Sequence, residues 1–214
     1  MSARIHRRNK LNVAWRRDLC AVGIALVGVV GMSAAPAAAA PGGECCRQLV
    51  VNGGFQRGAG DLPFAWTPDP YRPTASLVWD RHIGHHGHRS VRISDVNPTD
   101  SRWDQDVAVR PNTEYRLDGW IRTEDVRPGT EPMQFGANLS VLNTKDVTFD
   151  HSEPVLFGTH DWTYVSMQFN TEAATQVTVA ARLGFFSGTA SGTAWFDDIR
   201  LRPASCPTIP GHHS

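Results

Sequence analysis

The chain has 214 residues, 41% of them hydrophobic, and its 21 basic and 21 acidic side chains balance at pH 7. This length allows one domain with a sizeable core. The basic residues are scattered rather than gathered in a patch, which argues against nucleic acid and anionic membranes as partners.

The first 40 residues have the pattern of a secretory signal. Basic residues between Arg4 and Arg17 precede an uncharged apolar run, Leu19–Gly31, and small residues then lead to Ala40. The apolar run is shorter than the roughly 20 residues needed to span a bilayer. The sequence therefore predicts a cleaved signal over residues 1–40, secretion to the extracellular space and no membrane anchor.

The remaining residues, 41–214, are predicted to form a single domain with its core at about 47–203. They carry 15 basic and 20 acidic side chains, a net charge of −5. Cys45 and Cys46 lie at the start of this domain and Cys206 at its end. Secretion permits disulfides, and neighbouring cysteines rarely pair with each other, so we expect Cys206 to bond to one of the other two. Three free thiols are the alternative.

Eight stretches alternate apolar and polar residues over the length of a strand, with Gly, Pro, Asn and Asp between them. No window of a dozen residues keeps a helical period with caps. This pattern predicts an all-β fold, a two-sheet antiparallel β-sandwich. The predicted strands are Ala75–Asp80, Arg89–Ser94, Trp103–Val109, Glu114–Glu124, Gln134–Leu142, Thr163–Asn170, Gln176–Phe186 and Thr193–Arg202.

The last of these strands carries a carboxylate in an unusual position. Side chains in a strand repeat every two residues, so Asp197 should share the apolar side with Ile199 and Leu201. An unpaired buried carboxylate is very costly, and this side of the strand offers no positive charge. We therefore expect a metal ion or a set of backbone N–H groups beside Asp197.

Several motifs along the chain are weak alone but fairly specific in their order and spacing. They are Asn52–Gln56, Pro63 with Trp66, Gly84–Ile93, Val107–Ile121, Trp162–Val165 and Ala194–Leu201. With these motifs, residues 47–203 resemble carbohydrate-binding modules of the family 4/9/22 type. The resemblance implies a galactose-binding-domain-like jelly roll and a non-catalytic protein that binds a polysaccharide or glycan.

The same resemblance implies a structural Ca²⁺ between the first and last strands. By position, Asp197 would supply a carboxylate oxygen, Gly54 a carbonyl, Gln56 an amide oxygen and the Gly84–Arg89 loop further carbonyls. These are the hard oxygen ligands that Ca²⁺ prefers. Gln56 stands where such modules usually have a carboxylate, so the affinity should be lower. Backbone N–H groups around Asp197 are the alternative.

The predicted sugar-binding face centres on Trp120. On the strand Glu114–Glu124, the alternation directs Arg116, Asp118, Trp120 and Arg122 away from the core. A pyranose ring can stack on the indole while its hydroxyls bond to charged neighbours. Tyr164, Asn138 and Arg182 have the matching outward parity and would share the face if the strands are ordered as in the resembling family. Packing of Trp120 under a loop is the alternative.

Other chemistry is less well supported. His82, His85, His86 and His88 lie in a Gly-rich turn with no cysteine or carboxylate at zinc-ligand spacing, so we interpret them as solvated loop residues. Asp104 and Asp106 could share a strand face, but no hydrolase or lyase motif accompanies them. An extracellular adhesion or protein-interaction module on the same fold is the second candidate function. The sequence leaves the sugar and the oligomeric state open.

Overall fold

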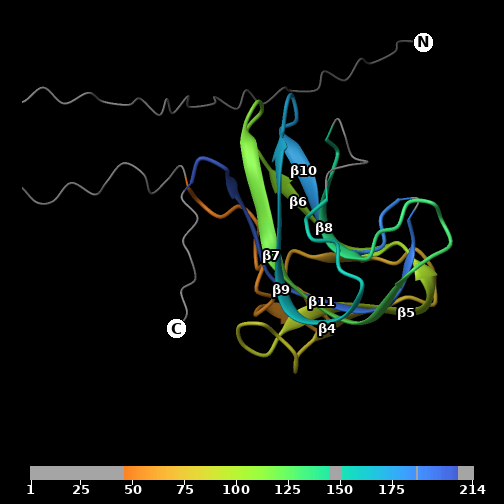
Figure 1. Ribbon diagram of the computed structural model, residues 1–214. Coiled ribbons are helices and arrows are strands. Elements are labelled where there is room, and N and C mark those ends of the chain that lie inside the picture. The colour runs from red at the N-terminus through yellow and green to blue at the C-terminus, as the bar shows by residue number, and fades with distance from the viewer. Residues whose placement is uncertain (1–45, 145–150, 187, 207–214) are drawn as a thin grey trace, which may run out of the picture. The chain divides into compact units, whose positions relative to one another are not determined.

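The computed structural model describes residues 46–144, 151–186 and 188–206 (Figure 1). All of them belong to the unit formed by Pro41–Ser214. The predicted signal sequence and Cys45 lie outside the described residues. Within the described ranges the regular structure is entirely β, and no helix has the length and hydropathy of a membrane span.

The strands form two antiparallel sheets and a small hairpin, grouped as Figure 1 shows. The hairpin consists of β1 (Gly58–Ala59) and β2 (Leu62–Pro63). In spatial order, the four-stranded sheet consists of β3 (Thr67–Asp69), β6 (Ser101–Ala108), β10 (Gln176–Leu183) and β8 (Ala137–Leu142). The five-stranded sheet consists of β4 (Ser76–Asp80), β5 (Ser90–Thr99), β11 (Ala190–Pro203), β7 (Glu114–Pro128) and β9 (Gly158–Asn170).

This architecture confirms the predicted two-sheet antiparallel sandwich. Each of the eight predicted strands corresponds to one of β4 to β11, with ends that differ by a few residues. The sequence analysis missed β1, β2 and β3. These strands have only two or three residues each, which is too short for an alternating pattern to be recognised.

The core lies between the sheets and is built from the inward positions that the alternation predicts. Leu117 and Ile121 on β7 face Leu139 on β8 and Val179 on β10, and all four are fully buried. Burying a side chain of this size contributes about 1.5–3 kcal/mol, so the sandwich depends on many such contacts together.

The two ends of the domain are joined covalently. Cys46 and Cys206 form a disulfide across a sequence separation of 160 residues, which confirms the expected bond and identifies its partner as Cys46. Next to it, the Leu49 N–H donates to the Leu201 carbonyl at 2.9 Å. The segment that precedes β1 is therefore held against β11, the strand at the centre of the five-stranded sheet.

Candidate functional site

The outer face of the five-stranded sheet carries the aromatic pair that the sequence predicted. Trp120 on β7 and Tyr164 on β9 are register partners, with ring centroids 5.7 Å apart. However, the His85 ring stacks on the Trp120 indole, 4.0 Å away and nearly parallel, at 18°. One face of the indole is therefore covered by the loop between β4 and β5, as in the packing alternative.

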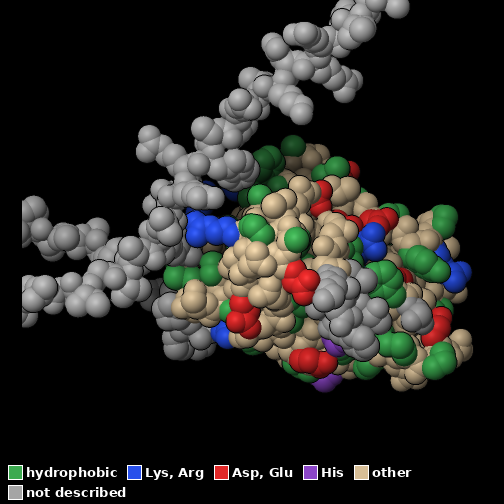
Figure 2. Space-filling view, turned by 90° about the horizontal axis from the view of Figure 1, so that it is seen from above, with side chains coloured by type: hydrophobic (Ala, Val, Ile, Leu, Met, Phe, Trp, Pro, Cys, Tyr) green, Lys and Arg blue, Asp and Glu red, His purple; other side chains and the backbone are tan. Residues whose placement is uncertain are grey.

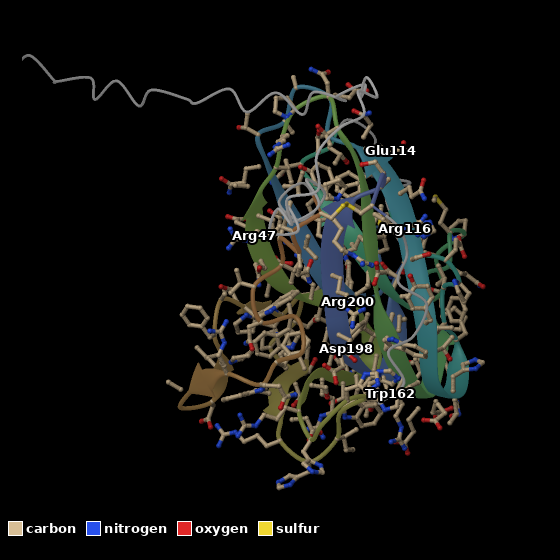
Figure 3. All side chains as sticks on the ribbon, turned by 90° about the vertical axis from the view of Figure 1, so that its left-hand side faces the viewer. Arg47, Glu114, Arg116, Trp162, Asp198 and Arg200 are labelled. Carbon is tan, nitrogen blue, oxygen red and sulfur yellow. A yellow bond between two sulfur atoms is a disulfide. The ribbon has the colours of Figure 1, made fainter. Side chains whose placement is uncertain are left out.

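The charged neighbours of Trp120 are held by contacts within the chain. Asp118 is buried and accepts a hydrogen bond from Arg202 Nη2 at 3.0 Å. Burial raises the pKa of Asp118 above its ordinary value, although Arg202 and the nearby Arg200 and Arg116 lower it. The guanidinium of Arg122 lies 5.5 Å from the centre of the Trp195 ring. Figure 3 shows Arg116, Arg200 and Asp198 along this side of the molecule.

Two of the predicted sugar ligands, Asn138 and Arg182, do not share this face, so that part of the prediction is wrong. They lie opposite each other on β8 and β10 of the four-stranded sheet, and both are buried. Their outward parity is as expected, but they point outward from the other sheet. Alternation in a sequence shows which residues share a strand face, whereas strand order decides which sheet that face belongs to.

Arg182 is held by a buried ion pair. Its Nε and Nη2 donate to the two carboxylate oxygens of Asp100 at 2.6 and 2.7 Å. The guanidinium also lies 4.7 Å from the ring centre of Phe185 and 4.8 Å from that of Phe186. The paired charge, with two rings beside it, forms one end of the outer face of the four-stranded sheet.

This outer face has unmet hydrogen-bonding capacity. Five buried side-chain atoms have no hydrogen-bond partner among the described residues, and only Arg92 Nε belongs to the five-stranded sheet. The other four are Asp104 Oδ1, Asn138 Oδ1, Ser140 Oγ and Arg182 Nη1. A buried polar group left without a partner costs about 1–3 kcal/mol, so such groups are uncommon in a native fold.

The four atoms come from two neighbouring rows of the sheet. In one row Ala180 on β10 lies between Asp104 on β6 and Ser140 on β8. In the next row Arg182 lies between Arg102 and Asn138. The unpartnered atoms are therefore gathered on one face rather than dispersed through the domain.

A hollow of about 660 Å³ lies over the open part of this face and exposes Asp104. We call it the polar groove. Its size is within the range of about 300–1,000 Å³ that is usual for ligand sites. Its lining is mainly polar, and the residues are Val51, Ala65, Thr67, Arg102, Asp104, Gln105, Asp106, Leu142, Asn143 and Thr178.

Inside the polar groove, Asp104 accepts a bond from Arg102 Nε at 2.8 Å through Oδ2, and its Oδ1 is the atom without a partner. Burial raises the pKa of Asp104 above its ordinary value, although the bond from Arg102 lowers it. Asp106 accepts a bond from the Thr178 hydroxyl at 2.6 Å. The side chains that line the groove are thus held in place, and the unpartnered oxygen of Asp104 lies buried beneath the surface of the groove.

Aromatic rings lie beside this face, and the sequence analysis did not single them out. Phe135, His151, Phe185 and Phe186 contact one another with centroids 5.0–5.5 Å apart. Phe186 is 47% exposed, and Tyr71, which bonds to Ser101 beside β6, is 57% exposed. In the sequence, the aromatic pair Phe185-Phe186 directly precedes Ser-Gly, and this pattern could have indicated rings at the end of a loop.

The second notable feature is a β-bulge in β11 at Asp197 and Asp198. The register of β11 against β7 shifts between Asp197 and Arg200, and Asp198 has a φ of 51°. The bulge reverses the alternation, so Asp197 lies opposite Trp120 on the outer side while Ile199 and Leu201 face the core. The predicted parity of Asp197 was therefore wrong, although the side chain is fully buried.

Asp197 is fully buried, and a backbone N–H group bonds to each of its carboxylate oxygens. The His85 N–H donates to its Oδ2 at 2.8 Å and the Asp198 N–H to its Oδ1 at 2.7 Å. Burial, followed by the neighbouring Asp198 carboxylate, raises the pKa of Asp197 to about 8, although these backbone bonds lower it. The backbone N–H groups that the sequence analysis gave as the alternative partners are thus present.

The three residues expected to bind calcium are brought together at the bulge. The Gln56 amide nitrogen lies 2.6 Å from the Gly54 carbonyl oxygen. A Cβ on Gly54 would lie 3.5 Å from Asp198 Oδ1 and 3.9 Å from Asp197 Oδ1, so this backbone directly adjoins both carboxylates. A Cβ on Gly53 would lie 1.9 Å from the Ile199 carbonyl oxygen, so only glycine allows this close approach.

Two of the loop histidines are not free solvated residues as we expected, because both lie against a carboxylate, although His86 stays exposed. His85 Nδ1 lies 2.9 Å, and His86 Nδ1 2.6 Å, from Asp198 Oδ2, and the His85 side chain is only 15% exposed. His82 and His88 are exposed, as predicted. The carboxylate that joins His85 and His86 is more than 110 residues away in the chain, so local ligand spacing could not reveal it.

These features define an antiparallel jelly-roll sandwich with a polar groove on one sheet and a histidine–carboxylate cluster on the other. No family model matches the chain. The tRNA nuclease WapA of Bacillus subtilis strain 168 is 31% identical over 99 residues, 45% of this chain. The tRNA(Glu)-specific nuclease WapA of B. subtilis subsp. natto gives the same values. The chain spans about 4% of the length of these curated relatives.

Solved structures with similar folds include carbohydrate-binding modules. TmCBM61 in complex with β-1,4-galactotriose has 19% identity and a TM-score of 0.47, with coverage of 73% of this chain and 99% of that one. The CBM22-1 xylan-binding domain of Paenibacillus barcinonensis Xyn10C has 13% identity and a TM-score of 0.48, covering 72% and 93%. A cyclase from Fischerella sp. TAU has 15% identity and a TM-score of 0.50, covering 75% and 100%. At such identities the likeness concerns the fold.

Proposed function

We propose that this protein is a secreted, non-catalytic carbohydrate-binding protein that binds a polysaccharide or glycan in the polar groove. The observation that carries the proposal is the set of four unpartnered polar atoms on the outer face of the four-stranded sheet. The resemblance in sequence to carbohydrate-binding modules supports the class of ligand. The predicted signal over residues 1–40 supports secretion, because extracellular glycans are met outside the cell.

A sugar chain suits the chemistry of this face. Each hydroxyl can both donate and accept a hydrogen bond, and the unpartnered set contains both kinds of group: acceptors on Asp104 and Asn138 and a donor on Arg182. Asp104 is the member that lines the hollow, so it is the first contact we assign to the ligand. The exposed ring of Phe186 or Tyr71 supplies an apolar surface of the kind on which a pyranose stacks.

A glycan array followed by calorimetry with the best glycan tests this function. Replacing a residue whose hydrogen bonds orient the ligand should cost about 1.5–3 kcal/mol when a charged group is involved, so Asp104→Ala should weaken binding about tenfold or more. Trp120→Ala is the matched control on the other sheet and should bind normally. If only Trp120→Ala loses binding, the glycan site lies on the outer face of the five-stranded sheet instead. If no glycan binds the intact protein, the adhesion function replaces this proposal.

We also propose a structural Ca²⁺ where Gly54, Gln56 and Asp197 meet. The residues fit such an ion, because the Gly54 backbone adjoins the carboxylates of Asp197 and Asp198, and Gln56, whose amide nitrogen bonds to the Gly54 carbonyl, would present its oxygen after rotation of the amide. When bound, Ca²⁺ would supply the positive charge that balances two adjacent carboxylates. The bound ion would then link the segment before β1, through Gly54 and Gln56, to the bulge in β11, through Asp197.

The calcium site is tested by melting the chelated protein with and without added Ca²⁺. A ligand at one hundred times its dissociation constant adds about 2.7 kcal/mol of stability, so the shift should be measurable. Asp197→Ala should remove the shift, and Asp61→Ala, which removes a fully exposed carboxylate, should keep it. Gln56→Glu adds one negative charge to the ligand set and should strengthen Ca²⁺ binding. Equal melting in every case would exclude the site.

A further inference from the structure

The histidine pair at the bulge forms a cluster that is separate in its chemistry from the calcium ligands. The ligand atoms of His85, His86 and Asp198 all lie within 4.8 Å of one another. Both histidines direct the same ring atom, Nδ1, at one oxygen, Asp198 Oδ2. Asp198 Oδ1, by contrast, is the oxygen that lies near Gly54. The carboxylate of Asp198 therefore stands between an oxygen-lined site and a nitrogen-lined site.

From this geometry we propose that His85, His86 and Asp198 bind a transition-metal dication of the Zn²⁺ type. Imidazole nitrogen with carboxylate oxygen suits Zn²⁺, whereas Ca²⁺ takes oxygen ligands. Zn–N and Zn–O bonds of about 2.0–2.2 Å place tetrahedral ligand atoms about 3.3 Å apart. The observed separations of 2.9 and 2.6 Å need only a small opening of the side chains to reach that distance. Water can complete the coordination.

The surroundings hold the ligands in position. The His85 ring is fixed from one side by stacking on Trp120 and contacts the Trp162 ring edge-on, with centroids 5.7 Å apart. The backbone N–H of the same residue bonds to Asp197, so the loop is anchored at this point. Figure 3 shows Asp198 and Trp162 close together at one end of the sheet. His86 remains 55% exposed, which leaves the cluster accessible to an ion from solvent.

Binding here would have a structural consequence. The loop between β4 and β5 and the bulge in β11 are distant in sequence, and the metal would join them through their side chains. Since the loop also carries the ring that covers Trp120, the ion would fix that cover in place. The site uses Asp198 and two imidazoles that have no part in the polar groove, so its occupancy is independent of the proposed glycan function.

The test is calorimetric titration of the full chain, freed of metal by a chelator, with Zn²⁺ and separately with Ca²⁺. Loss of a residue that only supports a metal ligand typically weakens binding 10–100-fold, and loss of a ligand should do at least as much. We therefore expect His86→Ala to reduce Zn²⁺ affinity roughly tenfold or more. The ring of His86 is exposed, so this variant should fold normally. His88→Ala, in the same loop and also exposed, is the matched control and should bind Zn²⁺ like the parent.

A spectroscopic measurement distinguishes the loss of a metal ligand from a general loss of structure. Co²⁺ substituted for Zn²⁺ should give the visible absorption of a tetrahedral nitrogen- and oxygen-ligated ion in the parent and in His88→Ala, and not in His86→Ala or Asp198→Asn. Zn²⁺ binding that is the same in His86→Ala and in the parent would overturn the proposal. So would full displacement of Zn²⁺ by equimolar Ca²⁺, because the imidazole nitrogens would then not be ligands.

Discussion

The outer faces of the two sheets differ in how their polar groups are satisfied. On the five-stranded sheet, Asp118 bonds to Arg202, Arg122 lies over Trp195, and Trp120 is covered by His85. On the four-stranded sheet, four buried polar atoms have no partner among the described residues, and the residue of one of them, Asp104, lines a hollow of about 660 Å³. Alternation along the strands predicts which side chains point away from the core on both sheets, but it does not predict which of them find hydrogen-bond partners in the folded chain.

Side chains of one charge do not gather on the side of the molecule that is visible in Figure 2. On the face of the molecule that Figure 2 shows, acidic and basic side chains are interspersed rather than collected in one region. The contrast lies in individual hydrogen bonds. Substitutions that remove single hydrogen-bond partners on each face therefore test this difference.

The largest loss of stability should come from removing the disulfide between Cys46 and Cys206, which joins the two ends of the domain. In the chain-entropy model, opening a loop of 160 residues removes about 5 kcal/mol from the free energy of unfolding. Denaturant unfolding of the double variant Cys46→Ser, Cys206→Ser measures this loss. Calorimetry at a temperature where the variant is folded should show unchanged affinity for the best glycan. A changed affinity would show that the polar groove depends on the joined ends.

The next effect should appear at the buried end of the four-stranded face. Asp100→Ala leaves Arg182 buried without its carboxylate and should lower the free energy of unfolding by about 3–5 kcal/mol. Arg202→Ala is the counterpart on the five-stranded face. Asp118 keeps the attraction of Arg200 and Arg116 there, so the loss should be smaller, about 1–3 kcal/mol. Equal losses in denaturant unfolding would remove the distinction between the faces.

A smaller effect should follow from the tryptophan on the five-stranded face. Trp120→Phe keeps a ring for His85 and Tyr164, whereas Trp120→Ala removes both ring contacts. Each aromatic pair contributes about 0.5–1.5 kcal/mol beyond its buried area, so the melting temperature should fall with alanine and much less with phenylalanine. Differential scanning calorimetry checks this. A glycan that protects Trp120 from fluorescence quenching would contradict the packing role.

The smallest effect should be the pH dependence that comes from Asp104. Its folded pKa is raised above the ordinary 3.8 by burial, so the folded state takes up the proton at a higher pH than the unfolded state does. The stability of the parent relative to Asp104→Asn should therefore increase as the pH falls through the folded pKa, and level off below 3.8. Paired unfolding curves across this range measure the difference. A difference that declines on acidification would mean that Arg102 outweighs burial.

The all-β class, the eight longer strands and a disulfide between the two ends of the domain could be predicted from the amino-acid sequence. These follow from period-two alternation, breaker residues and cysteine position, which are local or compositional properties. The resemblance also led us to expect Gly54, Gln56 and Asp197 in one calcium site, and that site stays a prediction.

The sheet to which Asn138 and Arg182 belong could not be predicted, because alternation carries no information on strand order. The tertiary structure also decided the position of Asp197, since one extra residue in the bulge reversed the parity of β11. The histidine–carboxylate cluster depends on a contact across more than 110 residues, and the unpartnered atoms on the outer face of the four-stranded sheet depend on which side chains lie next to them. Both are properties of the packed chain, because a hydrogen bond or a metal ligand set is fixed by distances in space and not by separation along the sequence.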